Sequence, residues 1–320
     1  MKDDSQIGLR GLGTALPERF IPLAELPLSS DHEVLAGFGF EGAYVADDIH
    51  ELSRRAAQCA LADAALAPGD IDALIFAGAL PQTHRRASEQ PTGVTLDEFC
   101  YAASWLHERL ALGKAEVCAI AQQGCAGMFS ALRHARALLI AEPALQHVLC
   151  VGGDALPAGA GREVLYNVVS DAACAVVVSR ADAWLRWRGF HQISKGYYWD
   201  IPAKQSEIIA AYFPSSRAAI QGVLARTGLQ AVDIDLVIPT GVNESSWPIL
   251  LRLCGIAEEQ LYRPRRRIGH TIAADSFIFL EEARATGCLH SGMRVLLFTY
   301  GFGSSWSALI AEVEEKEAAR

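Results

Sequence analysis

Short apolar runs alternate along the chain with segments whose apolar residues recur at helical spacing. Continuous apolar runs of this kind are typical of strands that are covered on both faces. The sequence predicts such strands at residues 73–77, 148–151, 175–178, 236–238 and 295–298. The helical spacing predicts helices at residues 52–66, 128–140, 218–227 and 277–286. This alternation indicates an α/β fold in which helices pack on sheets.

Two stretches of the chain are similar to each other. Residues 61–75 align without a gap with residues 224–238, and seven of the aligned positions are identical. Both copies read as a helix, a short turn, an aspartate-rich entry and a buried strand. Helix-turn-strand units often look alike by chance, but repetition at such a distance also fits an internal duplication. We expect two similar halves whose boundary lies within residues 179–187.

The composition is that of a packed globular enzyme. The 320 residues are 51% hydrophobic and 20% charged, with a formal net charge of −9 and no long basic run. These values exclude a disordered chain and argue against nucleic-acid binding, which needs a concentrated positive field. The polar N-terminus, and the lack of an apolar run near the roughly 18 residues of a span, predict neither a signal nor a membrane span. Eight scattered cysteines without a CxxC pair predict reduced thiols, a cytoplasmic protein and no metal site.

The most informative segment covers residues 117–129. A strand-like run ends there in small residues, and a helical segment begins at about Cys125. Unpaired N–H groups and the positive end of the helix dipole stabilise a thiolate at such a place. Glycine and alanine neighbours leave room for a substrate to approach the sulfur. Cys125 is either the nucleophile or another buried structural cysteine, and the flanking pattern favours the nucleophile.

Here the sequence resembles the ketoacyl-ACP synthase III group of the thiolase superfamily. The resemblance covers most of the chain, and its motifs occur in the family's order: Gln123-Gly124-Cys125-Ala126-Gly127, Val151-Gly152-Gly153-Asp154, Ser170-Asp171-Ala172-Ala173, Ile238-Pro239-Thr240-Gly241-Val242-Asn243, Ile268-Gly269-His270-Thr271-Ile272-Ala273-Ala274-Asp275 and Tyr300-Gly301-Phe302-Gly303-Ser304. It implies a thiolase fold, a duplicated five-layer α-β-α-β-α sandwich. Residues 1–180 would form the half with the nucleophile, and residues 181–320 the half with the histidine and glycine loops. The family forms homodimers, which we expect here too.

The chain departs from the family at two positions of the catalytic set. The decarboxylating synthases use Cys, His and Asn, whose His and Asn side chains stabilise the enolate that forms as carbon dioxide leaves. Thr240 stands where the family has the His of Pro-His-Gln-Ala-Asn, and His270 stands where it has the Asn of Gly-Asn-Thr-Ser-Ala-Ala-Ser. Losing one such donor costs about 2.7–4 kcal/mol, or roughly 10²–10³ in rate. Ordinary malonyl decarboxylation should therefore be crippled.

His270 is expected to act as a general base beside Cys125. Its unperturbed pKa of about 6.5 lies near working pH, and cysteine with histidine is sufficient machinery for acyl transfer. The alternative is a surface or satisfied core histidine. Asp275 completes a Gly-His-x-x-x-x-Asp pattern that resembles the family branch with a Cys-His-Asp set, which transfers acyl groups to oxygen or nitrogen. Asp275 either orients the imidazole or favours the first turn of the next helix, and the sequence leaves both open.

The other site residues follow from the resemblance. In the family, backbone N–H groups of the cysteine and of the C-terminal glycine loop form the oxyanion hole, which implies Cys125 and Gly303 here. Phe302 replaces the middle glycine of that loop and is expected to line the pocket. Thr240 and Asn243 either line the pocket and position the acceptor or are only loop residues.

A dense basic cluster directly precedes the His270 loop and comprises Arg263, Arg265, Arg266 and Arg267. Acyl donors in the family are thioesters of coenzyme A (CoA) or of acyl carrier protein. The cluster suits the phosphates of the first or the acidic helix of the second, and it equally suits a solvated face. We expect no permanently bound cofactor.

The leading hypothesis is an acyltransferase that moves an acyl group from acyl-CoA or acyl carrier protein, through a Cys125 acyl-enzyme, to a small alcohol or amine. A specialised pathway related to polyketides or fatty acids would use such an enzyme. The alternative is a carbon–carbon condensing enzyme with a Cys-His dyad, and a third hypothesis is an inactive partner in a heterodimer. Product mass separates the first two, because one makes an ester or amide and the other a ketone.

Overall fold

The structure is a computed structural model that describes residues 6–80, 99, 101–302 and 304–314. The first part of the chain forms, in order, β1 (Gly8–Ala15), β2 (Arg19–Pro22), α1 (His32–Gly37), β3 (Gly42–Val45), α2 (Ile49–Ala64), β4 (Ala73–Ala77), α3 (Ala102–Arg109), β5 (Glu116–Ile120), α4 (Gly127–Ala141), β6 (His147–Asp154), β7 (Glu163–Val164), β8 (Asn167–Val168) and β9 (Ala172–Ser179). The second part forms β10 (Leu185–Ser194), α5 (Ile201–Thr227), β11 (Leu236–Ile238), α6 (Ser246–Cys254), α7 (Asp275–Ala285), β12 (Arg294–Gly301) and β13 (Ser305–Val313). The five predicted strands lie within β4, β6, β9, β11 and β12, so their positions are confirmed.

Nine strands of the described chain follow one another in the order β11-β12-β13-β10-β1-β9-β6-β4-β5. Two residue pairs, Gly8 with Arg186 and Leu9 with Leu185, join β1 to β10. On both sides of this short junction the pairing repeats. The strands far from it are parallel (β5 with β4 and β4 with β6; β11 with β12), and β6–β9 and β12–β13 are antiparallel. The junction therefore connects two similar sheets.

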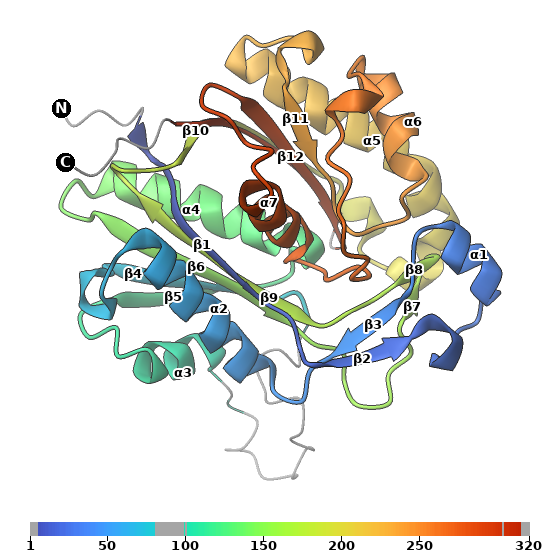
Figure 1. Cartoon of the computed structure of the whole chain (residues 1–320), viewed down its shortest axis with the longest axis horizontal. Coiled ribbons are helices and arrows are strands. Elements are labelled where there is room, and N and C mark those ends of the chain that lie inside the picture. The colour runs from blue at the N-terminus through green and yellow to red at the C-terminus, as the bar shows by residue number, and fades with distance from the viewer. Residues whose placement is uncertain (1–5, 81–98, 100, 303, 315–320) are drawn as a thin grey trace.

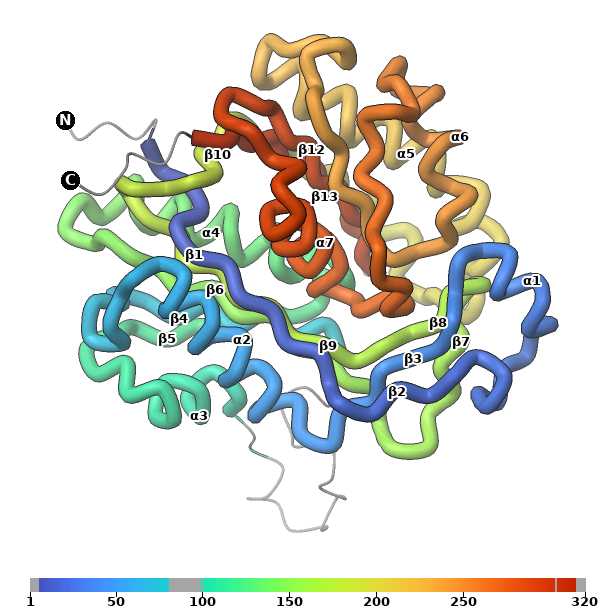
Figure 2. Tube along the Cα trace, viewed as in Figure 1, coloured from blue at the N-terminus to red at the C-terminus, as the bar shows by residue number. Residues whose placement is uncertain are grey.

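Helices and sheets form five layers (Figure 1), whose course Figure 2 traces as a tube. α2 and α3 pack on the outer face of β4, β6 and β9, and α5 and α6 pack on the outer face of β11, β12 and β13. α4 and α7 lie between the two sheets, where the rings of Phe129 and Phe277 meet with their centroids 5.8 Å apart. This α-β-α-β-α sandwich is the predicted architecture.

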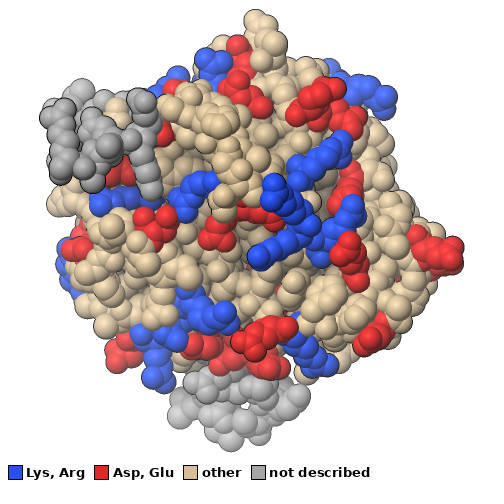
Figure 3. Space-filling view, viewed as in Figure 1, with Lys and Arg blue, Asp and Glu red and all other residues tan. Residues whose placement is uncertain are grey.

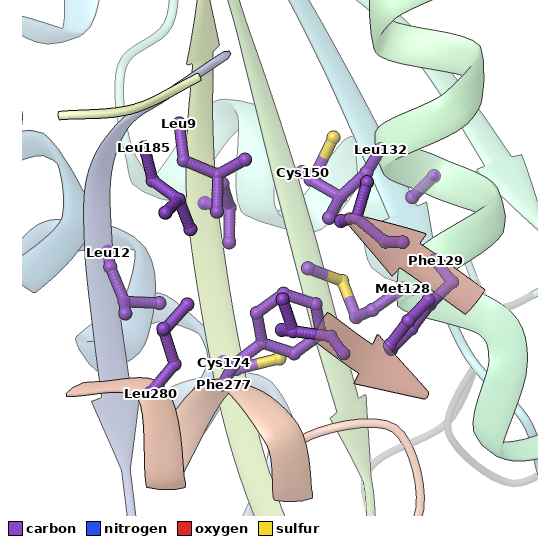
Figure 4. Packing of buried hydrophobic residues seen from close by; sticks show 14 of the residues in the cluster. Leu9, Leu12, Met128, Phe129, Leu132, Cys150, Cys174, Leu185, Phe277 and Leu280 are labelled. Carbon is purple, nitrogen blue, oxygen red and sulfur yellow. The ribbon is translucent and has the colours of Figure 1, made fainter. Parts of the chain in front are cut away.

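The middle layer supplies the largest buried cluster. Figure 4 shows Met128 and Phe129 of α4 and Phe277 and Leu280 of α7 among the side chains that fill it. Each of these four side chains is at most 1% exposed. Full burial of such a side chain contributes about 1.5–3 kcal/mol. Both helices are therefore held firmly, and their N-terminal ends are fixed in space.

The sequence repeat occupies equivalent places in the two halves. The turns Pro68–Asp70 and Ala231–Asp233 precede β4 and β11, and the last aspartate of each turn accepts a hydrogen bond of 2.8 Å from the N–H three residues before it. The second aspartates, Asp72 and Asp235, accept hydrogen bonds from N–H groups at the start of β6 and of β12. Identical residues therefore make the same contacts in both halves. The division at residue 180, which falls between β9 and β10, remains a proposal.

Helix α5 is longer than the sequence predicted. It begins at Ile201, whereas the pattern gave a start at residue 218. Pro214 lies inside the helix, and an interior proline costs about 3 kcal/mol because it removes a hydrogen bond and clashes with the preceding turn. Burial of Ala219, Ile220 and Val223 against the sheet offsets that cost. Within the described residues, no helix has the length and apolar character needed to cross a membrane.

Candidate active site

Cys125 lies in a short 3-10 turn, Gly124–Ala126, that leads directly into α4. The chain leaves the end of β5 and must turn sharply there, and Gly124 has a φ of +51°, which favours glycine. A Cβ at Gly124 would also clash with the backbone N and O of Phe302. No side chain caps the start of α4. The positive dipole end of α4 therefore lies next to the sulfur without a side chain between them.

The loop before α7 places His270 beside that sulfur. The backbone N–H of His270 donates to the carbonyl oxygen of Val168 at 2.7 Å, and its own carbonyl accepts from the N–H of Ser170 at 2.9 Å. These bonds fix the loop against the chain that follows β8. The result is a distance of 3.1 Å between His270 Nε2 and Cys125 Sγ. Two residues that are 145 positions apart in sequence therefore meet.

Asp275 lies on the other side of the imidazole. Its Oδ2 is 2.5 Å from His270 Nδ1, and its Oδ1 accepts from the backbone N–H of Thr271 at 2.5 Å and from the Thr271 hydroxyl at 2.6 Å. Asp275 is also the first residue of α7, so its position is compatible with both of the roles that the sequence left open. Thr271 was not singled out from the sequence, because any residue supplies a backbone N–H and a threonine in a loop carries no distinctive signal.

The ionisation of His270 is governed by its two neighbours. Burial by itself lowers the pKa of the ring. The charges of Asp275 and Cys125, and their hydrogen bonds to the two ring nitrogens, outweigh burial and raise the pKa of His270 well above 6.5. The carboxylate and the sulfur that flank the ring therefore both favour its protonated form.

The motif residue Asp171 supports this arrangement from behind. It is 1% exposed and forms two hydrogen bonds with Arg162, at 3.0 and 2.9 Å. It also accepts from the backbone N–H groups of Ala46 and Leu156. Removing one partner of a buried ion pair of this kind typically costs about 3–5 kcal/mol. Asp171 thus holds the segment that pairs with the His270 loop and is structural.

The other predicted residues lie at different distances from the chemistry. The backbone of Phe302 packs against Gly124, whereas Gly303 lies outside the described residues. Thr240 is 7% exposed, and its carbonyl oxygen accepts from the Trp247 indole at 3.3 Å. Asn243 Oδ1 accepts from the N–H of Ser245 at 2.9 Å, which makes Asn243 a turn residue before α6.

The arginine cluster borders a separate cavity of about 140 Å³ that is open to solvent. Arg263, Arg266 and Arg267 line it together with aromatic side chains, but Arg265, Cys125 and His270 do not. Basic side chains gather near the middle of the face shown in Figure 3. Arg267 pairs with Glu244 at 3.2 Å and with Glu41 at 3.5 Å, and Arg263 pairs with Glu258 at 2.5 Å. Local carboxylates therefore neutralise part of the cluster.

Left-handed backbone surrounds the site. Among non-glycine residues, Gln122 has a φ of 62°, Ile272 of 59° and Ser304 of 70°, and each lies close to Cys125, His270 or the C-terminal loop. Such conformations cost about 1–3 kcal/mol each and persist where the surroundings impose them. Within the described chain, no group of three or more His, Cys, Asp or Glu side chains is placed to hold a metal ion.

Comparisons with known proteins bear on this geometry. The family model described as 3-oxoacyl-[acyl-carrier-protein (ACP)] synthase III matches residues 121–196, and the model described as its C-terminal part matches residues 224–313. The two matched regions contain Cys125, His270 and Asp275 and together span just over half of the chain. This chain is a ketoacyl-ACP synthase III-like protein of the thiolase superfamily.

Relatives of this synthase III-like protein match nearly its whole length. A β-ketoacyl-[acyl-carrier-protein] synthase III of Nitratidesulfovibrio vulgaris is 27% identical and covers 94% of this chain and 97% of its own. The crystal structure of 3-oxoacyl-(acyl carrier protein) synthase III from Pseudomonas aeruginosa has a TM-score of 0.79 at 22% identity, covering 98% of this chain and 100% of its own. A structure titled as the acyltransferase ChlB3 has a TM-score of 0.81 at 20% identity, covering 97% and 98%. These likenesses confirm the thiolase fold, and the protein is an enzyme of the acyl-transferring type.

Proposed function

We propose that this protein transfers an acyl group from a thioester donor, through a thioester on Cys125, to the oxygen or nitrogen of a small alcohol or amine. One observation carries the proposal: His270 lies between Cys125 Sγ at 3.1 Å and Asp275 Oδ2 at 2.5 Å. This is the relay of nucleophile, base and orienting carboxylate that acyl transfer requires. It lacks the two neutral donors that stabilise the enolate in decarboxylating condensation.

The first half-reaction loads the enzyme. The Cys125 thiolate attacks the donor carbonyl, a carbon–sulfur bond forms, and the bond to the donor thiol breaks. The His270 imidazolium gives its proton to the departing thiolate, so the donor leaves as a neutral thiol. Cys125 then carries the acyl group and His270 is neutral. Charge and protons balance without any further reactant.

The second half-reaction depends on the same ring. Acylation removes the charge on sulfur, which is one of the two charges that raise the pKa of His270. The neutral ring then accepts the proton of the attacking hydroxyl or amine. The tetrahedral intermediate collapses to the ester or amide and restores the Cys125 thiolate with the His270 imidazolium. Asp275 holds Nδ1 throughout, so Nε2 always faces the reacting atoms.

The oxyanion of each tetrahedral intermediate needs hydrogen-bond donors. We assign this role to the backbone N–H of Cys125 and to that of Gly303 in the loop after β12. Packing of Phe302 against Gly124 supports the assignment, because it brings the backbone of this loop next to the cysteine turn. The start of α4 adds its positive dipole end at the same place. One such donor contributes about 2.7–4 kcal/mol.

We propose acyl-CoA or acyl carrier protein as the donor, docked through Arg265, Arg266 and Arg267. Support comes from the cavity that Arg266 and Arg267 border, because it also reaches Thr240 and Gly269 in the loops that hold the site. The aromatic side chains of Phe38 and Trp247 share that cavity. Arginine beside aromatic surface suits a phosphate-bearing ligand.

A homodimer is part of the proposal. Strand β5 ends the sheet, and the residues from Glu116 to Ala119 are exposed, including Val117 at 38%. An uncovered, partly apolar edge strand is normally paired or protected. Pairing of two β5 edges would join the sheets of two copies.

The test is intact-mass spectrometry with a panel of acyl thioesters, followed by mass analysis of the product. Wild-type protein should gain one acyl group, lose it to an alcohol or amine, and release thiol without carbon dioxide. Cys125→Ala should show no adduct and should lose about 10⁴–10⁶-fold in transfer rate. A ketone product would instead establish the condensing enzyme. If no thioester gives an adduct on Cys125, the inactive-partner hypothesis replaces the present one.

A further inference from the structure

Gly241 lies directly against the catalytic carboxylate. It follows Thr240 in the loop after β11, and one side of it faces the cavity that the arginines border. A Cβ at this position would lie 2.9 Å from Asp275 Oδ1 and 3.2 Å from Asp275 Cγ, and it would clash with the carbonyl oxygen of Gly269. Ordinary contact begins at 3.4 Å. Even the smallest side chain at residue 241 therefore needs the space that Asp275 occupies.

The backbone does not explain this glycine. Gly124 and Gly269 have φ values of +51° and +73°, in the left-handed region that favours glycine. The φ of Gly241 lies outside that region, so alanine would adopt the same backbone. The requirement for glycine at residue 241 is therefore steric.

The Asp275 side chain cannot move away from residue 241 without losing its hydrogen bonds. It is 1% exposed, and both of its oxygens are engaged, Oδ1 by the N–H and hydroxyl of Thr271 and Oδ2 by the His270 ring. Gly269 directly precedes His270. The backbone N–H of His270 donates to the carbonyl oxygen of Val168 at 2.7 Å, so this part of the loop is also held in place. A group added at residue 241 would thus displace either the carboxylate or the backbone that carries the imidazole.

We infer that the missing side chain at residue 241 is a built part of the catalytic set, because it provides the room in which the Asp275 carboxylate meets His270. Comparison of the two loop motifs with the family pattern supports the same inference. Where the family pattern pairs Gln with Ser, this chain pairs Gly241 with Asp275, so volume removed at one position matches volume added at the other. Gly241 is a positioning residue, and the inference rests on the proposed function only for its effect on acyl transfer.

The experiment compares Gly241→Ala with wild type by two measurements. The first is an NMR titration of ¹³C-labelled histidine, assigned with His270→Gln, which gives the pH at which the His270 ring loses its proton. We expect that midpoint to fall in Gly241→Ala, because the carboxylate that raises the pKa is pushed from Nδ1. The second is the acyl-transfer rate, which should fall about 10²-fold, the usual result of a 1 Å misplacement. Gly69→Ala is the matched control, because a Cβ there meets nothing within 4 Å.

A double variant shows whether Gly241 acts through Asp275. In Asp275→Ser the contact with the carboxylate is relieved, while the contact with the Gly269 carbonyl oxygen remains. Adding Gly241→Ala should therefore change the midpoint and the rate by less than it does in the wild-type protein. If Gly241→Ala fails to fold, Asp275→Ser should restore folding at least in part, because it removes one of the two contacts of the added Cβ. An unchanged His270 midpoint in Gly241→Ala, additive effects of the two substitutions, or unfolding that Asp275→Ser does not rescue would each overturn the inference. The midpoint is measurable even if no alcohol or amine accepts the acyl group, so the two proposals fail separately.

Discussion

Helices α4 and α7 occupy equivalent places in the two halves, yet their N-terminal ends hold different groups. Each helix leads into the strand, β6 or β12, that receives the repeated aspartate. The start of α4 has no side-chain cap and no acidic residue in its first turn, and the Cys125 sulfur lies beside it. The start of α7 has Asp275 in its first turn. Both ends stabilise negative charge.

This difference shows how a duplicated fold acquires two kinds of anion around one imidazole. In the proposed mechanism the anion at α4 is transient, because the sulfur loses its charge on acylation and regains it on release. At α7 the group is the Asp275 carboxyl, which does not take part in bond making and is buried and hydrogen-bonded through both oxygens. One half therefore supplies the group that changes, and the other supplies the group that keeps His270 oriented.

The variant with the largest expected effect on the contrast between α4 and α7 is Asp275→Asn, which keeps the shape of the side chain and removes its charge. We expect acyl transfer to fall by roughly 10²–10⁴-fold, since the imidazolium loses its counter-ion and its ring orientation. The pKa of His270, now raised well above 6.5, should move down, so the imidazolium should be lost at a lower pH. The stability that this ion pair contributes is fully present below the unfolded value near 6.5 and is lost as pH rises through the folded value.

Rate and stability of Asp275→Asn are to be measured across pH against Asp182→Asn. Asp182 pairs with Arg10 at 3.1 Å, but its side chain is 73% exposed, so its replacement should change little. If Asp275→Asn kept the wild-type rate and pH profile, Asp275 would be a helix-terminus residue alone.

The sequence predicted the strands well because they are short, apolar and buried on both faces. β4 and β11 begin and end where the pattern placed them. The repeat was also legible, because identical aspartates make identical contacts in the two copies. The predicted start of α5 was wrong. Pro214 is a strong local signal against a helix, but packing on the sheet overrides it.

The site divides along the same line. Cys125 and His270 were predictable because their motifs are local, although nothing local brings them to 3.1 Å from each other. Asp275 stayed ambiguous, since its role depends on a partner across a loop. The sequence did not point to Gly241 or Thr271 as site residues. Gly241 makes room because it has no side chain, and Thr271 donates hydrogen bonds from its backbone N–H and its hydroxyl. Contacts of these kinds exist only in three dimensions.

The repeated aspartates, Asp72 and Asp235, allow a second comparison of the two halves. Both should stabilise the fold through the same kind of hydrogen bond, but by different amounts. Asp72 accepts from the N–H groups of Gln146 and His147 and pairs with Lys114 at 2.8 Å, and its side chain is 11% exposed. Asp235 accepts from the N–H of Arg294 at 2.7 Å. At about 0.5–1.5 kcal/mol for each hydrogen bond, Asp72→Ala should lower the free energy of unfolding by about 2–3 kcal/mol and Asp235→Ala by about 1 kcal/mol. Urea unfolding of both variants measures this, and equal losses would contradict it.

The last contrast concerns the ends of β6 and β12. Both strands are eight residues long, and the last residue is Asp154 in β6 and Gly301 in β12. Gly301 lets the cysteine turn approach, since a Cβ there would lie 2.9 Å from the N of Cys125. Asp154 is 1% exposed and instead accepts from the N–H groups of Ala79 and Leu80, at 2.8 and 3.1 Å. Within the described chain, its Oδ2 has no hydrogen-bond partner.

Burial raises the pKa of Asp154 from 3.8 to about 7, so the folded protein holds a proton there that the unfolded chain releases. Between these two values the free energy of unfolding should therefore fall with rising pH, by about 1.4 kcal/mol per pH unit from this group. Asp154→Asn keeps the oxygen that accepts from Ala79 and cannot ionise, so its stability should lack this decline. Urea unfolding from pH 4 to pH 8 compares the two proteins, with the exposed Asp47→Asn as control. Parallel curves for wild type and Asp154→Asn would mean that Asp154 ionises freely in the fold, and the contrast between the ends of β6 and β12 would then be one of shape alone.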